Sequence, residues 1–239
     1  MVADLAVIVP TRGRPRRFLE MLEAIDRTAE TDVAVWLGVD EDDDVAAYRD
    51  VVRPRGRGDV FLNTGQRHSL SGWTNALATL ALQTPDPPRF LASLGDDHRP
   101  RTPGWDRRLI EAIDELGGSG IAYGNDLFQG ERLPTAWVVS ADIVRSLGWM
   151  MLPSCAHMYV DTATLMLGRA LDRIAYCPDV VIEHVHPMAG KTPWDASYRE
   201  SNAGPRYDAD REAFEAWERD GLDRDVERVR SGAVVGGAR

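Results

Sequence analysis

The chain has 239 residues, enough for one large domain with a substantial core. Its 44% hydrophobic and 28% charged content is typical of a soluble globular protein. The net charge of -10 argues against a basic surface for duplex nucleic acid, and two cysteines exclude a disulfide framework.

The first half of the chain alternates short apolar runs with helical patterns. Strands are predicted at residues 5–9, 33–39, 60–62 and 90–94, and the continuous apolar run of the first indicates burial on both faces. Amphipathic helices are predicted at residues 16–28, 45–52, 71–82 and 104–116, the third of them capped by Ser71. This order predicts a single-domain, three-layer α/β/α, Rossmann-like fold with a mainly parallel sheet.

The second half is less regular. We expect strands at residues 120–123, 135–139, 175–176 and 180–182, and helices at 141–147 and 159–171. Residues 188–207 are polar and aperiodic, which predicts a mobile loop that covers the functional site. A charged helix at 208–230 and a disordered tail at 231–239 complete the chain.

Polar side chains follow several of the predicted strands. Thr11 and Arg12 follow the first strand, Asp40 ends the second, and Asp96-Asp97-His98 follows the fourth. Ligands of such sheets bind at the carboxyl ends of the strands. Adjacent carboxylates and an imidazole suit a divalent cation that bridges a diphosphate. The sequence therefore predicts a metal and phosphate site at this edge.

A second histidine cluster supports that prediction. His184 and His186 follow the apolar run 179–182, and two residues spaced by two on an extended segment point to the same face. Either of them would supply a further metal contact.

The order of these features resembles the GT-A fold nucleotide-sugar glycosyltransferases, and is similar to family 2 members, over roughly residues 5–187. The similarity rests on Pro10-Thr11-Arg12 after the first strand, Asp40 after the second, and Asp96-Asp97-His98 as a variant of the acidic D-x-D motif. Asp161 before a helix and a histidine after the last strand complete it.

The resemblance implies a glycosyltransferase domain at residues 1–230, with a nucleotide-binding half at 1–116 and an acceptor and catalytic half at 117–187. It implies transfer of a sugar from a nucleotide-sugar donor, expected to be a UDP-sugar, to a hydroxyl acceptor with Mn²⁺ or Mg²⁺. Asp97 or His98, together with His186 or else His184, would bind the metal. Asp161 would be the base of an inverting displacement. The expected donor contacts are Pro10, Thr11, Arg12, Asp40, Arg67, Asp96 and Lys191, and the expected acceptor contacts are Trp105, Trp194 and Tyr198.

Structural interpretations compete with several of these roles. Asp161 is also a favourable acid at a helix N-terminus, and Lys191 is also typical of an exposed loop. Either His184 or His186 also suits a buried polar contact, and Trp105 also suits packing. We interpret Arg14, Arg16 and Arg17 as surface residues and Asp42-Asp43-Asp44 as a solvated turn.

Two other functions stay open at this point. A sugar-phosphate nucleotidyltransferase would need a glycine-rich phosphate loop, and Pro10 to Pro15 contains one glycine. A nucleotide- or carbohydrate-binding protein without turnover is the non-enzymatic alternative. The acceptor is open among cell-wall sugars, a metabolite, a protein and modified DNA, which the charge of -10 disfavours. The absence of a signal or a membrane-spanning run predicts a cytoplasmic protein of a bacterium or its phage.

Overall fold

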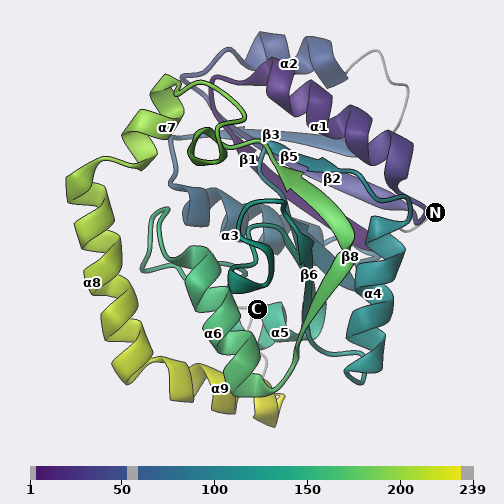
Figure 1. Ribbon diagram of the computed structural model, residues 1–239, viewed down its shortest axis with the longest axis vertical. Helices are drawn as coiled ribbons and strands as arrows, with labels where there is room; N and C mark the ends of the chain where they lie inside the picture. Colours follow the sequence, from purple (N-terminus) through teal and green to yellow (C-terminus); the bar gives the residue numbers. More distant parts are fainter. Residues whose placement is uncertain (1–3, 53–58, 233–239) are drawn as a thin grey trace.

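The sheet grows outward from β1 (Leu5–Thr11), which is buried on both faces as its unbroken apolar run predicts. The computed structural model describes residues 4–52 and 59–232 (Figure 1). Within them the strand order is β3-β2-β1-β4-β7-β6-β8-β5. The other strands are β2 (Val33–Asp40), β3 (Val60–Gly65), β4 (Phe90–Ser93), β5 (His98–Pro100), β6 (Ile121–Asn125), β7 (Trp137–Ser140) and β8 (Ile174–His184).

Strand direction divides the sheet into two parts. The first four strands of the chain pair in parallel, as do β6 and β8. Between these parts, β7 runs antiparallel to both β4 and β6, and β5 runs antiparallel to β8. The predicted α/β fold with a mainly parallel sheet is therefore confirmed. The antiparallel direction of β5 and β7 could not be predicted, because an apolar run does not indicate the direction of a strand.

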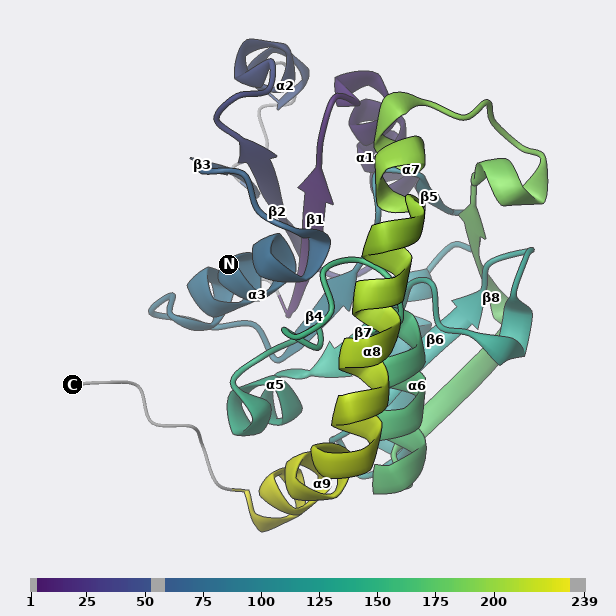
Figure 2. The same ribbon diagram turned by 90° about the vertical axis from the view of Figure 1, so that its left-hand side faces the viewer.

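Helices cover both faces of the sheet and complete the three layers (Figures 1 and 2). Ala6 and Ile8 of β1 belong to one apolar cluster, while Leu5, Val7 and Val9 belong to the other. The second cluster also holds the buried faces of α1, α2 and α4, and the first holds those of α3, α5, α6, α8 and α9. The helices are α1 (Pro15–Thr28), α2 (Val45–Val52), α3 (Leu70–Leu82), α4 (Trp105–Glu115), α5 (Ala141–Leu147), α6 (Val160–Leu171), α7 (Ala196–Ser201), α8 (Gly204–Asp220) and α9 (Leu222–Ser231), with 3₁₀ turns η2 (Gly130–Arg132) and η3 (Pro187–Ala189).

Four predicted boundaries need correction. Ser69 rather than Ser71 caps α3, since its hydroxyl accepts the Gly72 N–H at 3.0 Å. Residues 174–184 form one long strand instead of two short ones. The predicted helix at 208–230 is two helices that meet at Gly221, where a side chain would collide with Trp217. Residues 188–207, predicted as a loop, contain most of η3, all of α7 and the start of α8. Part of the predicted tail, 233–239, lies outside the described residues.

Gly124 controls how β8 reaches the end of the sheet. The register between β6 and β8 shifts between Gly124 and Asn125, and a methyl group on Gly124 would clash with the backbone carbonyl oxygen of Val180. We expect Gly124→Ala to lower the free energy of unfolding by about 1–3 kcal/mol, because the clash is with backbone. Urea denaturation would measure it. Gly204→Ala is the control, since a methyl group there meets nothing within 4 Å, and equal stability of the two variants would contradict the expectation.

Candidate active site

A cavity of about 670 Å³ opens at the carboxyl ends of β1, β2 and β4. It lies where parallel strands of an α/β sheet present polar residues to a ligand. The far wall comes from the end of β8, the N-terminus of α6 and residues 195–201, which are α7 with its capping Asp195 and are called the α7 segment below. Twelve of the predicted site residues line it: Pro10, Thr11, Arg12, Asp40, Arg67, Asp96, Asp97, His98, Asp161, His184, His186 and Tyr198.

Asp40 is a fixed acceptor at one end of the cavity. Its Oδ1 accepts the Trp73 indole N–H at 2.6 Å and the backbone N–H of His68 at 3.1 Å, and its Oδ2 accepts Arg12 at 2.8 Å. Arg12 also donates twice to Asp42, which lies in an exposed turn outside the cavity lining, as predicted. Arg67 pairs with Glu200 of α7.

Asp96 is buried in the cavity lining, where β1 and β4 end. The Thr11 hydroxyl donates to its Oδ2 at 2.6 Å, and Arg14 lies 3.2 Å from its Oδ1. Burial raises the pKa of Asp96 to about 6, with Arg14 opposing the rise and Asp97 adding to it. Arg14 was interpreted as a surface residue, which is wrong, because its side chain is only 12% exposed and lies beside this acid.

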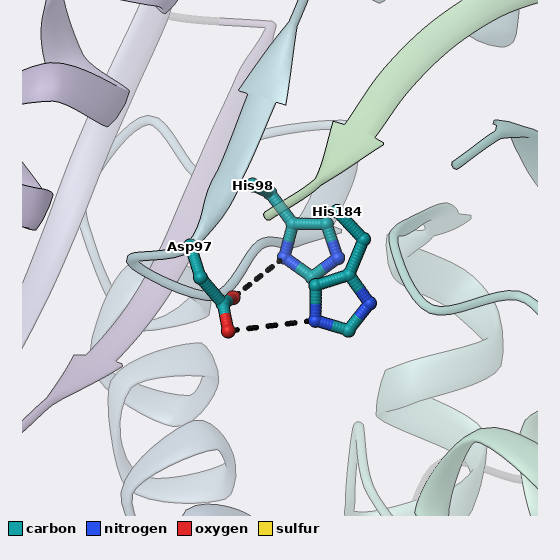
Figure 3. Close-up of side chains that lie close together, drawn as sticks. All are labelled: Asp97, His98 and His184. Atoms are coloured by element: carbon teal, nitrogen blue, oxygen red, sulfur yellow. Dashed lines mark ion pairs between the residues drawn. The ribbon is translucent and has the colours of Figure 1, made fainter. Parts of the chain in front are cut away.

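Asp97, His98 and His184 form a tight group, with one potential ligand atom of each lying within 4.8 Å of the others (Figure 3). Asp97 Oδ2 lies 3.4 Å from His184 Nε2, and Asp97 Oδ1 lies 3.5 Å from His98 Nδ1. The two imidazole rings stack with centroids 4.3 Å apart. His186 is not in this group, although its ring centroid lies 4.9 Å from that of His184, and its Nδ1 accepts the Met188 N–H at 3.2 Å. Of the two predicted histidines, the structure therefore brings His184 to Asp97.

Backbone pairing explains how residues 86 positions apart meet. His98 of β5 is opposite His184 of β8 in an antiparallel pair, where facing side chains are close. The Val185 N–H also donates to the carbonyl oxygen of Asp97 at 2.9 Å. A three-residue strand that begins at His98 leaves no periodic pattern, so this pairing could not be seen in the sequence.

The donor chemistry of this group fits a divalent cation. His98 Nδ1 and His184 Nε2 face Asp97, whereas His98 Nε2 and His184 Nδ1 lie on the other side of each ring, buried and without a hydrogen-bond partner among the described residues (Figure 3). Buried polar atoms without partners are rare and need an explanation. A carboxylate with imidazole nitrogens suits first-row divalent metals. His98 Nδ1, the nitrogen that faces Asp97, accepts the Gly95 N–H at 2.8 Å, so a cation held by Asp97 and this nitrogen would displace that hydrogen bond.

Charge around His184 is strongly negative. Burial opposes its charged form, but Asp97 outweighs this and raises the pKa of His184. Asp126 lies 3.9 Å from its Nδ1, and Asp161 adds to the same effect. Asp126 was not predicted as a site residue, although it follows a predicted strand in the manner of Asp40. Its Oδ1 accepts three backbone N–H groups, from Phe128, Gln129 and Gly130.

Asp161 begins α6 and lines the same cavity. Burial raises the pKa of its carboxyl group to about 7, His184 opposes the rise, and Asp126 and Asp97 add to it. An acid with a pKa near neutrality is suited to proton transfer. A stabilising role at the helix N-terminus would favour the ionised form, so the raised pKa fits that interpretation poorly.

Three predicted contacts lie outside the cavity lining. Trp105, the first residue of α4, is 0% exposed and packs in the core, which contradicts its predicted contact with an acceptor. The predicted phosphate contact Lys191 forms an ion pair with Glu183 at 3.0 Å. Trp194 is partly exposed and contacts the rings of His186 and Tyr198 edge-on. The cavity is lined instead by Arg14, which sequence patterns did not distinguish from its basic neighbours.

Comparison with solved structures identifies the architecture. The chain is similar to S. aureus TarS residues 1–349 in complex with UDP, with a TM-score of 0.59 and 12% identity over 74% of this chain and 59% of that one. It is also similar to the mannosyltransferase PcManGT from Pyrobaculum calidifontis in complex with GDP-Man and Mn²⁺, with a TM-score of 0.61 and 14% identity over 100% of this chain and 77% of that one. The fold is thus that of the GT-A glycosyltransferases, as the resemblance implied.

Sequence comparison adds no closer relative. No family model matches the chain. No curated protein matches it either. The chain spans 59% of the length of the TarS fragment, so the complete activity of that protein does not transfer to it. In the described residues, no helix is both long and apolar enough to cross a membrane.

Proposed function

We propose that the protein is a metal-dependent glycosyltransferase that moves a sugar from a nucleoside-diphosphate donor to a hydroxyl acceptor. The observation that carries the proposal is the Asp97–His98–His184 group in the same cavity as Asp40 and Asp161. TarS with UDP and PcManGT with GDP-Man and Mn²⁺ share this fold, which supports the donor class and the metal.

The residues divide into a donor side and an acceptor side. Pro10, Thr11, Arg12 and Asp40 border the end of the cavity that would receive the nucleotide. Asp97 and His184, with His98 beside them, would hold Mn²⁺ or Mg²⁺. When bound, a divalent cation stabilises the negative charge that develops on a departing diphosphate. Asp96 would meet the ribose or support Asp97 from behind.

Asp161 is the proposed general base. It lies across the cavity from the donor strands, at the start of α6, and no hydrogen bond from a described residue holds its carboxylate. It would take the proton of the acceptor hydroxyl as the oxygen attacks the anomeric carbon from the face opposite the leaving group. Such a displacement inverts the anomeric configuration. Tyr198, which lines the cavity, and Trp194, which contacts the Tyr198 ring from outside the lining, would contact the acceptor.

A screen of nucleotide sugars tests the proposal. UDP- and GDP-sugars would be incubated with the protein and Mn²⁺ or Mg²⁺, and release of the nucleoside diphosphate would be measured. We expect slow donor hydrolysis, and calorimetric binding of UDP or GDP that depends on the metal. Binding without turnover of any donor would instead support a binding protein. No binding of either diphosphate would contradict both.

A further inference from the structure

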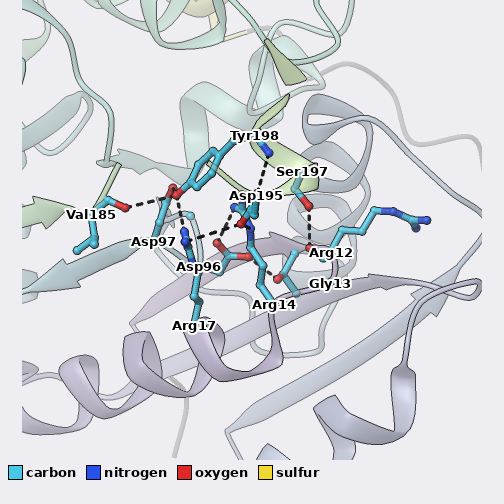
Figure 4. A network of polar contacts seen from close by, with 12 residues as sticks. Arg12, Gly13, Arg14, Arg17, Asp96, Asp97, Val185, Asp195, Ser197 and Tyr198 are labelled. Atoms are coloured by element: carbon cyan, nitrogen blue, oxygen red, sulfur yellow. Dashed lines mark hydrogen bonds and ion pairs between the residues drawn. The ribbon is translucent and has the colours of Figure 1, made fainter. Parts of the chain in front are cut away.

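The α7 segment places an acid against Arg14, which lines the cavity (Figure 4). Asp195, the residue before α7, accepts two hydrogen bonds from one edge of the Arg14 guanidinium. Nε donates to Oδ2 at 2.9 Å and Nη2 donates to Oδ1 at 2.7 Å. Arg17 lies 3.7 Å from the same carboxylate. This is the paired geometry in which a guanidinium binds a carboxylate or a phosphate.

Arg14 has a second acidic partner in Asp96 and also packs on Tyr198 of the α7 segment. Its Nη1 lies 3.2 Å from Asp96 Oδ1, and its guanidinium lies 3.8 Å from the centre of the Tyr198 ring. It lines the cavity beside Thr11 and Asp96, at the carboxyl ends of β1 and β4. A mostly buried cation in this position needs an anion, and the segment supplies one from 181 residues away in the chain.

The same segment also covers the proposed metal ligand. The Tyr198 hydroxyl donates to Asp97 Oδ2 at 2.7 Å and accepts from Arg17 Nη1 at 2.6 Å. Asp195 in turn accepts the Tyr198 N–H at 2.9 Å, which joins the two residues into one unit. A diphosphate near Asp97 would meet both the Asp195 charge and the Tyr198 hydroxyl.

We propose that Arg14 binds the diphosphate of the donor, and that Asp195 occupies this anion position when no donor is bound. The inference rests on the proposed function, because it takes the cavity to be a nucleoside-diphosphate site. The donor then exchanges with Asp195 on the two N–H groups of Arg14, and the α7 segment leaves Asp97. The apparent Kd then equals the intrinsic Kd divided by the fraction of molecules in which the segment has left the site.

Calorimetry with UDP and GDP in the presence of Mn²⁺, and with uridine and guanosine, tests the exchange. Asp195→Asn removes the charge but keeps a side chain that caps α7. We expect this variant to bind the diphosphates about tenfold more tightly and the nucleosides unchanged. Arg14→Gln should bind the diphosphates at least about tenfold more weakly, again with little change for the nucleosides. Arg199→Gln, an exposed change on the same helix, is the control and should match the wild type.

Tighter binding is a gain that damage to the fold would not produce. The inference is overturned if Asp195→Asn binds UDP and GDP no better than the wild type, or if nucleoside binding tightens equally. Unchanged diphosphate binding by Arg14→Gln would also overturn it. If neither diphosphate binds wild type or variant, the proposed function fails together with the inference, whereas binding that ignores Asp195 defeats the inference alone.

Discussion

Asp97→Asn is expected to lower kcat/KM for sugar transfer by at least about 10³-fold, because metal stabilisation of a leaving group contributes several kcal/mol. Asparagine has nearly the same size but offers a neutral oxygen, so it would bind a divalent cation weakly. Asp97 is also the acid closest to His184, which is 3.4 Å away, and to His98. The loss should therefore appear in metal binding as well as in activity.

Two measurements separate these effects. Electron paramagnetic resonance of Mn²⁺ would give the affinity for the metal alone, and donor turnover would give the activity. We expect both to fall in Asp97→Asn, and neither to change in Asp223→Asn, an exposed acid of α9. An Asp97→Asn protein that still binds Mn²⁺ and transfers sugar like the wild type would rule out the assigned ligand.

Asp161→Asn is expected to lower kcat by about 10²–10⁴-fold while the diphosphate still binds, because a general base contributes this much. The raised pKa of about 7 also predicts the pH dependence of the wild type. The base acts in its ionised form, so kcat/KM should be full above pH 7 and fall as the pH drops through this value. Asp172→Asn, at the exposed end of the same helix, is the control and should retain activity.

At alkaline pH, Asp161→Asn should lower the activity but raise the stability of the folded protein. Burial raises the pKa of Asp161 from its usual 3.8 to about 7 in the folded protein. The folded state therefore binds this proton more tightly, and that stabilisation is lost as the pH rises through 7. At pH 8, Asp161→Asn should melt at a higher temperature than the wild type. A variant that is inactive but less stable would suggest a structural role instead.

The sequence predicted the strands with continuous apolar runs and the polar residues that follow them. β1, β2 and β4 are buried on both faces, and such strands have continuous apolar runs in the sequence. Parallel strands then bring their carboxyl ends to one edge, so Thr11, Asp40 and Asp97 could be placed together without coordinates. The GT-A resemblance followed from the same residues.

Only the tertiary structure decided which charged residues meet. Arg14 and Arg16 are alike in the sequence, yet Arg14 lies in the cavity on Asp96 and Asp195 while the Arg16 side chain is 91% exposed. His184 rather than His186 faces Asp97 because β5 pairs with β8 in one particular register. Local patterns record which face of an element is apolar, whereas a contact between side chains 181 residues apart depends on how the elements pack.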